Sequence, residues 1–238
     1  MNTTHALPRA RPRRGGLRRG FLTPERIVEE SLRLLDTGGV AGFSMPKLGR
    51  ALGADPTAVY RHFASKDDLV LAIADRLIEE AMGGLTPNEC WVETLTDATR
   101  RLRRTYRAHP AAASLSSFRT TSRPAEIRAV DVLLDAVFQA GFEGLEAAVI
   151  YRSVGDFALS WCGGEASLLA LPGPLQANDR AAWTRVYRAV ERTEYPHIWQ
   201  VRDELPLVTD DDIFESILAM VISGLRQRAP RPCSCGRH

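Results

Sequence analysis

The chain has 238 residues, of which 45% are hydrophobic and 25% charged, the proportions of an ordinary soluble globular protein. No apolar run approaches the ~20 residues that span a bilayer, and the basic N-terminus lacks the apolar core of a secretion signal, so we expect a cytoplasmic protein. The net charge of +2 is unevenly distributed: six of the 31 basic residues lie within residues 1–20, which leaves 25 basic against 29 acidic residues in the rest.

The chain opens with a basic arm and a first helix. Residues 1–19 are rich in Arg, Pro and Gly and have almost nothing to bury, which predicts a disordered segment. One interpretation is an arm that follows DNA phosphates or enters the minor groove, and the alternative is a solubilising tail. The helix is predicted to begin after the cap Thr23, with Pro24 in its first turn, and to end at Gly38-Gly39.

Two shorter helices joined by a tight turn follow. Ser44 is a good N-cap for the first of them, and Gly53 can end it in the left-handed conformation. Asp55 caps the second, whose buried stripe is Val59 and Phe63. This pattern is typical of a helix-turn-helix, whose second helix enters the major groove of DNA. Its outer side combines methyl, hydroxyl and cationic groups suited to base edges and phosphates. The residues predicted to contact DNA are Ser44, Met45, Lys47, Pro56, Thr57, Ala58, Tyr60, Arg61, His62 and Lys66.

A fourth helix is predicted from Lys66 to about Met82, ended by Gly83-Gly84. The run from Phe21 to Glu80 resembles the DNA-binding domain of the tetracycline-repressor (TetR) family. Three pieces carry the resemblance: the apolar residues Ile27, Leu32, Leu34 and Leu35, the segment Gly42-Phe-Ser-Met-Pro-Lys-Leu-Gly-Arg-Ala-Leu-Gly53, and the segment Val59-Tyr-Arg-His-Phe-Ala-Ser-Lys-Asp-Asp-Leu69. The resemblance implies that the fourth helix links a DNA-reading head to the body of the protein.

The rest of the chain is predicted to be all-α. Apolar residues recur at helical spacing from Trp91 to Pro110, from Pro124 to Gly141, and in a third run that finishes at Gly163-Gly164. No run of β-branched residues alternates with polar residues as a half-buried strand would. Residues 165–180 are predicted to be a linker or an elaborated loop, and a helix is predicted from Asp179 to about Thr193.

The resemblance implies that the helix at 144–162 and the last helix of the chain form a four-helix bundle with a second subunit. Gly155 and Ala158 would permit close approach of helices, and the last helix carries a wide apolar stripe. The alternative is that both stripes face the internal core. A two-fold dimer would double the contacts of one helix-turn-helix and match a palindromic operator. The acids at 210–212 are interpreted as the cap of the last helix rather than as a metal site.

The resemblance also implies a small-molecule pocket in the body, whose occupation tilts the fourth helix and separates two heads. The segment Glu194-Tyr-Pro-His-Ile198 resembles the tetracycline-repressor type of C-terminal domain. A pocket needs mostly apolar walls with a few polar anchors. The candidate lining residues are Tyr106, His109, Phe118, Leu134, Phe138, Arg152, Asp156 and Trp161. For Arg152 and Asp156 the alternative is an i,i+4 pair on an exposed or interface face, and for His109 a helix-end cap.

The cysteines lead to no catalytic or metal assignment. Cys90 and Cys162 lie in helical contexts and are interpreted as small buried hydrophobes. Cys233 and Cys235 lie close to His238 but lack a fourth ligand. The Pro- and Arg-rich residues 229–238 are therefore predicted to be a disordered tail.

Four parts are predicted in total: an arm at 1–19, a DNA-binding domain at 20–82, a ligand-binding and dimerisation domain at 83–228, and a tail at 229–238. The predicted function is that of a homodimeric transcriptional regulator, in particular a repressor that a small-molecule effector releases from a palindromic operator. No cofactor, metal or membrane partner is expected. Two alternatives stay open, an all-α enzyme with a fused helix-turn-helix and an effector-independent DNA-binding protein. The sequence has no HExxH, GxSxG or Walker motif that would favour the enzyme.

Overall fold

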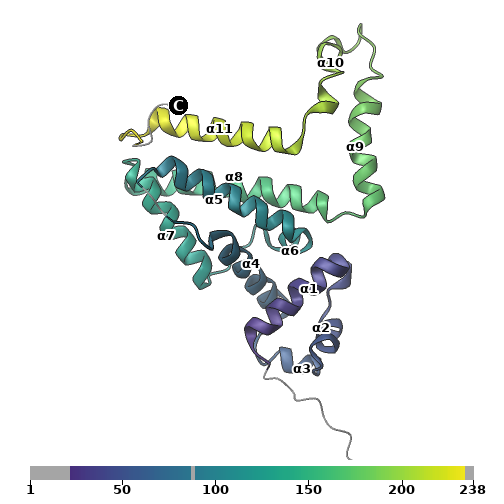
Figure 1. The fold of residues 1–238 in the computed structure, drawn as a ribbon, viewed down its shortest axis with the longest axis vertical. Helices are drawn as coiled ribbons and strands as arrows, with labels where there is room; N and C mark the ends of the chain where they lie inside the picture. Colours follow the sequence, from purple (N-terminus) through teal and green to yellow (C-terminus); the bar gives the residue numbers. More distant parts are fainter. Residues whose placement is uncertain (1–21, 87–88, 234–238) are drawn as a thin grey trace, which may run out of the picture.

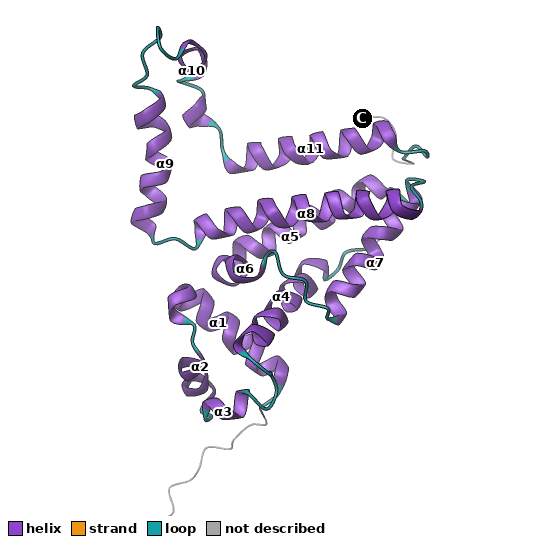
Figure 2. Ribbon diagram, turned by 180° about the vertical axis from the view of Figure 1, so that it is seen from behind, coloured by secondary structure: helices purple, strands orange, loops and turns teal. Residues whose placement is uncertain are grey.

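The computed structural model describes residues 22–86 and 89–233, and every regular element within these ranges is helical (Figures 1 and 2). The fold class predicted from the sequence is therefore confirmed. None of the helices in these ranges is both long and apolar enough to cross a membrane. The elements are α1 (Pro24–Gly42), α2 (Met45–Leu52), α3 (Pro56–Val59), α4 (Lys66–Met82), α5 (Trp91–Ala108), α6 (Pro110–Ser116), α7 (Pro124–Gln139), α8 (Gly144–Leu169), α9 (Gly173–Tyr187), α10 (Pro196–Val201), the 3₁₀ helix η1 (Leu205–Leu207) and α11 (Asp210–Arg228).

Helices α1, α2 and α3 form a small head at one end of the molecule (Figure 1). The Ser44 hydroxyl accepts a hydrogen bond from the backbone N–H of Lys47 and so caps α2 as predicted. Gly53 closes the same helix with a φ of +62°, a conformation that glycine adopts without a steric penalty. The head encloses a compact apolar core, whose most deeply buried members are Ile27, Leu35, Leu48, Val59 and Phe63.

Two helices continue past the glycines that were predicted to end them. α1 bends at Gly39, which has a φ of +61°, and continues to Gly42. α8 passes through Gly163 and ends only at Leu169. A Cβ at Gly163 would collide with the side chain of Ser117, so this glycine permits close approach of the chain after α6 instead of ending a helix.

Helix α4 runs from the head into the body, where it packs against α5, α6 and α7 (Figure 1). α5 in turn packs against α8, and α11 lies along the outer side of this pair. The apolar interiors of head and body form one continuous core. Its largest fully buried side chains in the body and in α4 are Leu69, Ile73, Leu77, Trp91, Tyr106, Phe142 and Phe214.

Residues 170–209 project from the body as an arm that contains α9 and α10 (Figure 1). The predictions of a linker at 165–180 and of a helix beginning at Asp179 are therefore wrong. α9 already begins at Gly173, because Pro174 occupies its first turn, where a backbone N–H donor is not needed. No residue of α9 or α10 is buried, and the rings of Trp183 and Tyr187 contact each other with centroids 4.8 Å apart.

A carboxylate of α4 caps the start of α7. Asp75 accepts hydrogen bonds from the backbone N–H groups of Ala125 (3.3 Å) and Glu126 (2.9 Å). The residue at the N-cap position of α7, Arg123, makes no such side-chain bond of its own. The orphan donors of α7 are thus satisfied from a neighbouring helix rather than from its own sequence. Two ion pairs, Arg119–Asp67 at 2.7 Å and Arg123–Asp68 at 2.6 Å, extend the same contact.

The segment after α11 is attached to the body and is not a free tail. The backbone N–H of Arg231 donates a hydrogen bond of 3.0 Å to the carbonyl oxygen of Ala140, at the end of α7. Residues 229–233 therefore differ from the disordered tail predicted for this region, while residues 234–238 fall outside the described ranges. Cys90 at the start of α5 takes part in a disulfide bond, so its interpretation as a simple buried hydrophobe is incomplete.

A charged cluster with a buried centre joins α5, α8 and α11. Arg103 donates two hydrogen bonds of 2.8 Å to Glu165, and both residues are less than a tenth exposed. The Arg103 guanidinium also lies 4.4 Å from the centre of the Phe214 ring. Asp211 at the start of α11 pairs with Arg103 and with Arg107, each at 2.7 Å. These contacts, first of all the hydrogen bond from Arg103, lower the pKa of Asp211.

We expect the stability of the protein against urea to fall as the pH drops below about 4.5. Hydrogen bonds from arginine partners hold the pKa of Asp67, Asp211 and Glu215 below the ordinary values of 3.8 and 4.5. A carboxylate with a lowered pKa stabilises the folded state above its ordinary pKa, and this contribution is lost as the pH falls through the lowered value. Urea titrations from pH 7 to pH 2 measure the effect. Asp67→Asn should flatten the acid limb, and a midpoint that rises below pH 4 would contradict the assignment.

Candidate nucleic-acid interface and ligand cavity

The outer end of the head is formed by α3 and the turn that follows it. Asp55 Oδ1 accepts hydrogen bonds from the hydroxyl of Thr57 (2.7 Å) and from its backbone N–H (2.8 Å). The hydroxyl bond and then the backbone bond lower the pKa of Asp55. Together they fix the side chain of Thr57 at the start of α3 while leaving that residue exposed. A methyl group and an oxygen acceptor are thereby held in place at the surface.

Most of the residues predicted to contact DNA lie on this end of the head. Val59 and Phe63 face the core, and Tyr60 between them is 47% exposed. Met45 is the exception, because it is only 7% exposed and belongs to the core of the head. The exposed members are Lys47, Thr57, Tyr60, Arg61, His62 and Lys66, and the half-buried members are Ser44, Pro56 and Ala58.

Both lysines of the chain are held against the head. Lys47 donates a hydrogen bond from Nζ to the carbonyl oxygen of Ala41 at 3.1 Å. Lys66 Nζ lies 5.2 Å from the centre of the Phe43 ring, within the range of a cation–π interaction. Each ammonium group therefore loses less side-chain freedom on meeting a phosphate than a fully extended lysine would.

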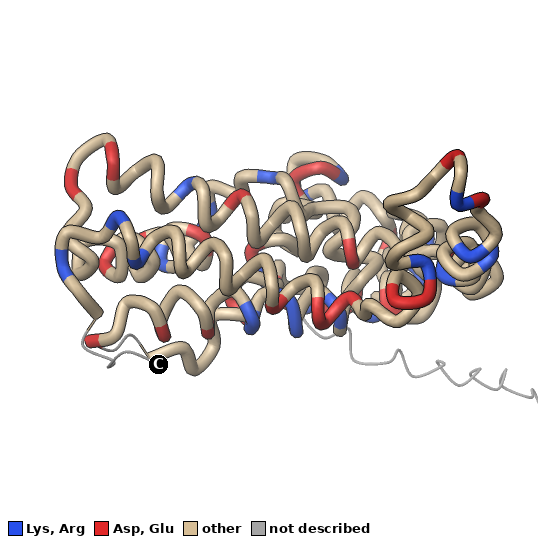
Figure 3. Tube along the Cα trace, turned by 90° about the horizontal axis from the view of Figure 1, so that it is seen from above, with Lys and Arg blue, Asp and Glu red and all other residues tan. Residues whose placement is uncertain are grey.

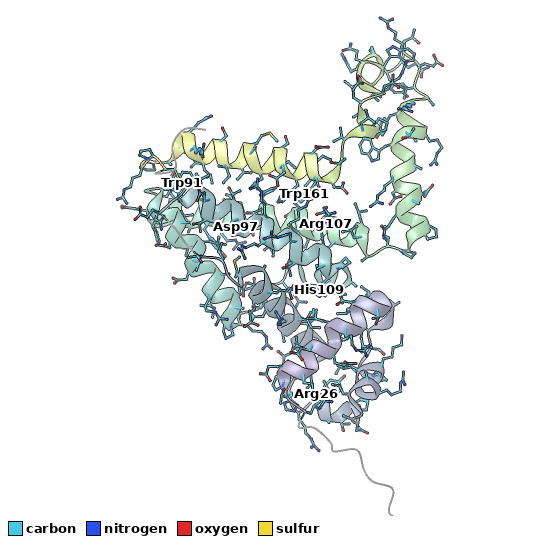
Figure 4. All side chains as sticks on the ribbon, viewed as in Figure 1. Arg26, Trp91, Asp97, Arg107, His109 and Trp161 are labelled. Atoms are coloured by element: carbon cyan, nitrogen blue, oxygen red, sulfur yellow. The ribbon has the colours of Figure 1, made fainter. Side chains whose placement is uncertain are left out.

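The first turn of α1 lies at the same end of the head. Glu25 is close enough to His62 that this histidine contributes to lowering its pKa, after the backbone and Thr23 hydrogen bonds. Arg26, in the same turn, is exposed and was not predicted as a contact (Figure 4). The predicted arm at 1–19 falls outside the described residues. On the helices of the body, Arg positions are interspersed with Asp and Glu (Figure 3).

The residues predicted to line a ligand pocket are not brought together in one cavity. Tyr106 is buried in the core, which raises the pKa of its hydroxyl. Phe118 is 70% exposed and Phe138 is 49% exposed. Arg152 and Asp156 form an exposed ion pair of 3.2 Å, which is the alternative interpretation of their spacing. Leu134 and Trp161 are half-buried in α7 and α8.

His109 connects the body to the head instead of lining a cavity. It lies between α5 and α6 (Figure 4), and its Nδ1 is 2.9 Å from a carboxylate oxygen of Asp36 in α1. Its Nε2 is 3.5 Å from Glu80 in α4. The imidazole thus contacts one carboxylate on each of the two helices that join the head to the body.

A cavity of about 720 Å³ lies where the arm meets α8 and α11. Its polar side is the outer edge of the charged cluster, with Arg107, Glu165 and Asp211. Its apolar walls come from α8, the arm and the start of α11, and they are Leu168, Leu169, Leu171, Trp183, Leu205, Pro206, Val208 and Ile213. None of the eight predicted pocket residues lines it. In the described ranges no group of His, Cys, Asp or Glu is arranged to hold a metal ion.

Two family models match the chain. The model described as "Tetracyclin repressor-like, C-terminal domain" matches residues 84–229, which is more than half of the chain. The model described as "Bacterial regulatory proteins, tetR family" matches residues 27–73.

Individual relatives agree with these matches. An HTH-type transcriptional regulator of Saccharopolyspora erythraea is 28% identical over 149 residues, which is 63% of each chain and so less than two thirds of that protein. The class A tetracycline repressor from transposon 1721 of Escherichia coli is 25% identical over 87% of this chain and 92% of its own. A structure from Streptomyces coelicolor, described as a possible TetR family transcriptional regulator, is 29% identical with a TM-score of 0.72 and covers 87% of this chain and 100% of its own.

Proposed function

The chain belongs to the tetR family of bacterial regulatory proteins, and from this premise we propose that it is a homodimeric repressor that a small-molecule effector releases from a palindromic operator. Members of this family are regulators, so the alternative of an enzyme is set aside. In the proposal, residues 20–82 form the DNA-binding domain, residues 83–228 bind the effector and the second subunit, and the protein acts in the cytoplasm, where the operator lies.

The observation that carries the proposal is the outer end of the head. Tyr60 lies in sequence between the core residues Val59 and Phe63 and is 47% exposed, and the side chain of Thr57 on the same helix is fixed by Asp55. Lys47 and Lys66 lie on the same small domain, ready to contact phosphates. Base-reading groups flanked by phosphate-binding groups are what a recognition helix in the major groove requires.

Exposed apolar residues on α8 and α11 support the dimer. Leu145 is 82% exposed, Val149 is 50% exposed and Met220 is 62% exposed, although all three lie on long, regular helices. Gly155 and Gly224 have open space where a Cβ would stand, so a second pair of helices could approach closely. Large exposed apolar patches on well-packed helices are typical of interfaces between subunits.

The cavity beside the arm is the proposed effector site. Apolar walls with a charged edge suit a small molecule that has a flat apolar body and at least one polar or ionised group. Arg107 and Asp211 at that edge also belong to the cluster that holds α5, α8 and α11 together. A ligand that displaced one of these contacts would change the packing of α5, on which α4 lies.

Binding to DNA tests the proposal most directly. We expect the purified full chain to protect a palindromic site in the DNA flanking its own gene, and analytical ultracentrifugation to give the mass of a dimer alone and of one dimer on one operator. The proposal predicts a steep loss of affinity with salt, because phosphate contacts release counterions. Binding that shows no preference over random DNA of equal length, or a chain that stays monomeric at micromolar concentration, would contradict it.

The effector site has its own test. The probe 1-anilinonaphthalene-8-sulfonate combines a flat apolar body with an anionic group, and we expect it to bind the cavity with enhanced fluorescence. Trp183→Ala removes one apolar wall and should weaken probe binding by roughly five-fold, on the order of 1 kcal/mol. Ile127→Ala, at an exposed position on α7 outside both the cavity and the proposed subunit interface, is the matched control and should leave the affinity unchanged. Equal effects of the two substitutions would argue against the cavity.

A further inference from the structure

The segment proposed to read DNA is held at both of its ends by a carboxylate. α3 spans only Pro56–Val59, and residues 60–62 continue it as a turn. Asp55 caps the start of this segment through the two hydrogen bonds described above. Beyond its other end, Asp68 Oδ2 accepts a hydrogen bond of 2.9 Å from the backbone N–H of Ala64. A helix of one turn is marginal by itself, so the groups that bond to its two flanks decide where its side chains stand.

The two carboxylates differ in what holds them. The bonds that Asp55 makes in the described part of the chain stay within the head. Asp68 belongs to the first turn of α4, where its backbone N–H donates to the hydroxyl of Ser65 at 3.0 Å. Its second oxygen, Oδ1, accepts a hydrogen bond of 2.6 Å from Nη2 of Arg123, and the same nitrogen lies 3.4 Å from its backbone carbonyl oxygen. Since Arg123 immediately precedes α7, a side chain of the body reaches the turn after α3 through one carboxylate.

Arg123 is itself held by a buried part of the body. Its backbone N–H donates a hydrogen bond of 3.1 Å to the hydroxyl oxygen of Thr121, which is only 4% exposed. The side chains of Arg123 and Asp68 are 31% and 33% exposed, so water competes less for this ion pair than for a pair on the open surface. The guanidinium therefore has a fixed base and a partly enclosed partner, which are the conditions under which one side chain can orient another.

We propose that Arg123 is a positioning residue for operator binding, an inference that rests on the function proposed above. It orients the carboxylate of Asp68 toward the backbone N–H of Ala64 and thereby holds Tyr60 and its neighbours in the orientation that meets the major groove. Without the guanidinium, the side chain of Asp68 gains rotational freedom, and water competes for its bond to Ala64. The recognition segment then loses one of its two fixed ends, although every group that faces DNA is still present.

Operator affinity, measured by fluorescence anisotropy with a labelled fragment, gives the first test. Arg123→Ala should weaken binding by roughly five- to ten-fold, because each subunit of a dimer loses a charge-assisted hydrogen bond that fixes the segment. Arg123→Lys keeps a cationic donor on this residue and should recover the affinity to within about three-fold of the wild type.

Arg119→Ala is the matched control. Arg119 lies in the same connection between α6 and α7 and makes two bonds, of 2.7 and 2.8 Å, to Asp67 in the same turn of α4. In the described part of the chain, Asp67 makes no bond to the turn after α3. Both variants lose one positive charge at a similar distance from the head, so a general electrostatic effect would weaken them equally. Arg119→Ala should change operator affinity by less than about two-fold, and equal losses in the two variants would overturn the proposal.

Hydrogen exchange measured by NMR on the full chain without DNA separates the positioning from the proposed function. The amide of Ala64 should exchange roughly ten-fold faster in Arg123→Ala, while Arg119→Ala and the amides in the middle of α4 keep the rates of the wild type. Unchanged exchange of Ala64 in Arg123→Ala would overturn the positioning even if the wild type binds its operator. A wild type without preference for the operator would instead overturn the function, whatever the exchange rates are.

A double-mutant cycle shows whether Arg123 acts through Asp68. Asp68→Ala removes the carboxylate, so Arg123→Ala/Asp68→Ala should bind the operator no more weakly than Asp68→Ala alone. Losses that multiply in the double variant would show that Arg123 acts by another route and would refute its role as a positioning residue. If a thermal melt shows that Asp68→Ala does not fold, Asp68→Asn, which keeps an oxygen acceptor at the same place, takes its position in the cycle.

Discussion

Replacing Arg103 with Met is expected to lower the free energy of unfolding by about 3 kcal/mol, near the lower end of the range for breaking a buried ion pair. Glu165 would lose both 2.8 Å hydrogen bonds and keep only Arg107 at 3.4 Å, while its side chain stays enclosed. The contact of the guanidinium with Phe214 would be lost as well. For a chain of this length the melting temperature should fall by about 6 to 12 °C.

A double substitution distinguishes an unpaired charge from lost packing. In Arg103→Met/Glu165→Met both charges are replaced by apolar side chains of similar length, so no ion remains buried without a partner. Stability should return close to that of the wild type, as it does when a buried pair is replaced as a unit. Guanidinium titrations followed by circular dichroism measure all three proteins. If the double variant is less stable than Arg103→Met, the loss of stability in Arg103→Met does not come from an unpaired buried carboxylate, and our account is wrong.

Replacing Tyr60 with Ala is expected to weaken operator binding roughly thirty-fold or more. A contact to sugar, phosphate or base contributes about 1 to 3 kcal/mol, and a dimer would lose it twice. Tyr60 is 47% exposed, so about half of its side chain is buried, and the substitution should lower the free energy of unfolding by about 1 kcal/mol. Fluorescence anisotropy with a labelled operator fragment measures the affinity, and a thermal melt confirms that the head remains folded.

Thr57→Ala is the matched control on the same helix. It removes the methyl and hydroxyl groups that Asp55 holds in place, and it should change the preference at one or two positions per half-site. Tyr60→Ala should instead reduce affinity for every operator variant. Equal losses for Thr57→Ala on specific and random DNA would show that Thr57 reads no bases. An unchanged affinity of Tyr60→Ala would remove the central contact from the proposed interface.

The head could be predicted from the sequence because its signals are local. Ser44, Asp55 and Ser65 each accept a hydrogen bond from a backbone N–H two or three positions ahead, and Gly53 takes its positive φ within the same turn. Caps, first-turn prolines and closing glycines depend only on neighbours in the chain. Met45 shows the limit of this reasoning. It was predicted to contact DNA, while tertiary packing buries it in the core of the head.

The cavity and the contact of the C-terminal segment could not be predicted in the same way. The cavity depends on how α9 and η1 return toward α8 and α11, which no local pattern records. Gly163 reads as a helix end, yet its role is to admit Ser117 from another part of the chain. Cys90 and Cys233 meet only because the chain after α11 crosses the turn after α7. Contacts between distant segments are set by packing, so a single sequence gives them no periodic signature.

The capping of α7 by Asp75 has a mechanical consequence. Rotating or sliding α4 relative to α7 would withdraw one carboxylate from two backbone donors at once, and water could not easily replace it at a partly enclosed site. We therefore expect α4 and α7 to travel together as one rigid pair during any change of state. Movement of the head relative to the body would then occur at the contacts that His109 makes with Asp36 in α1 and Glu80 in α4.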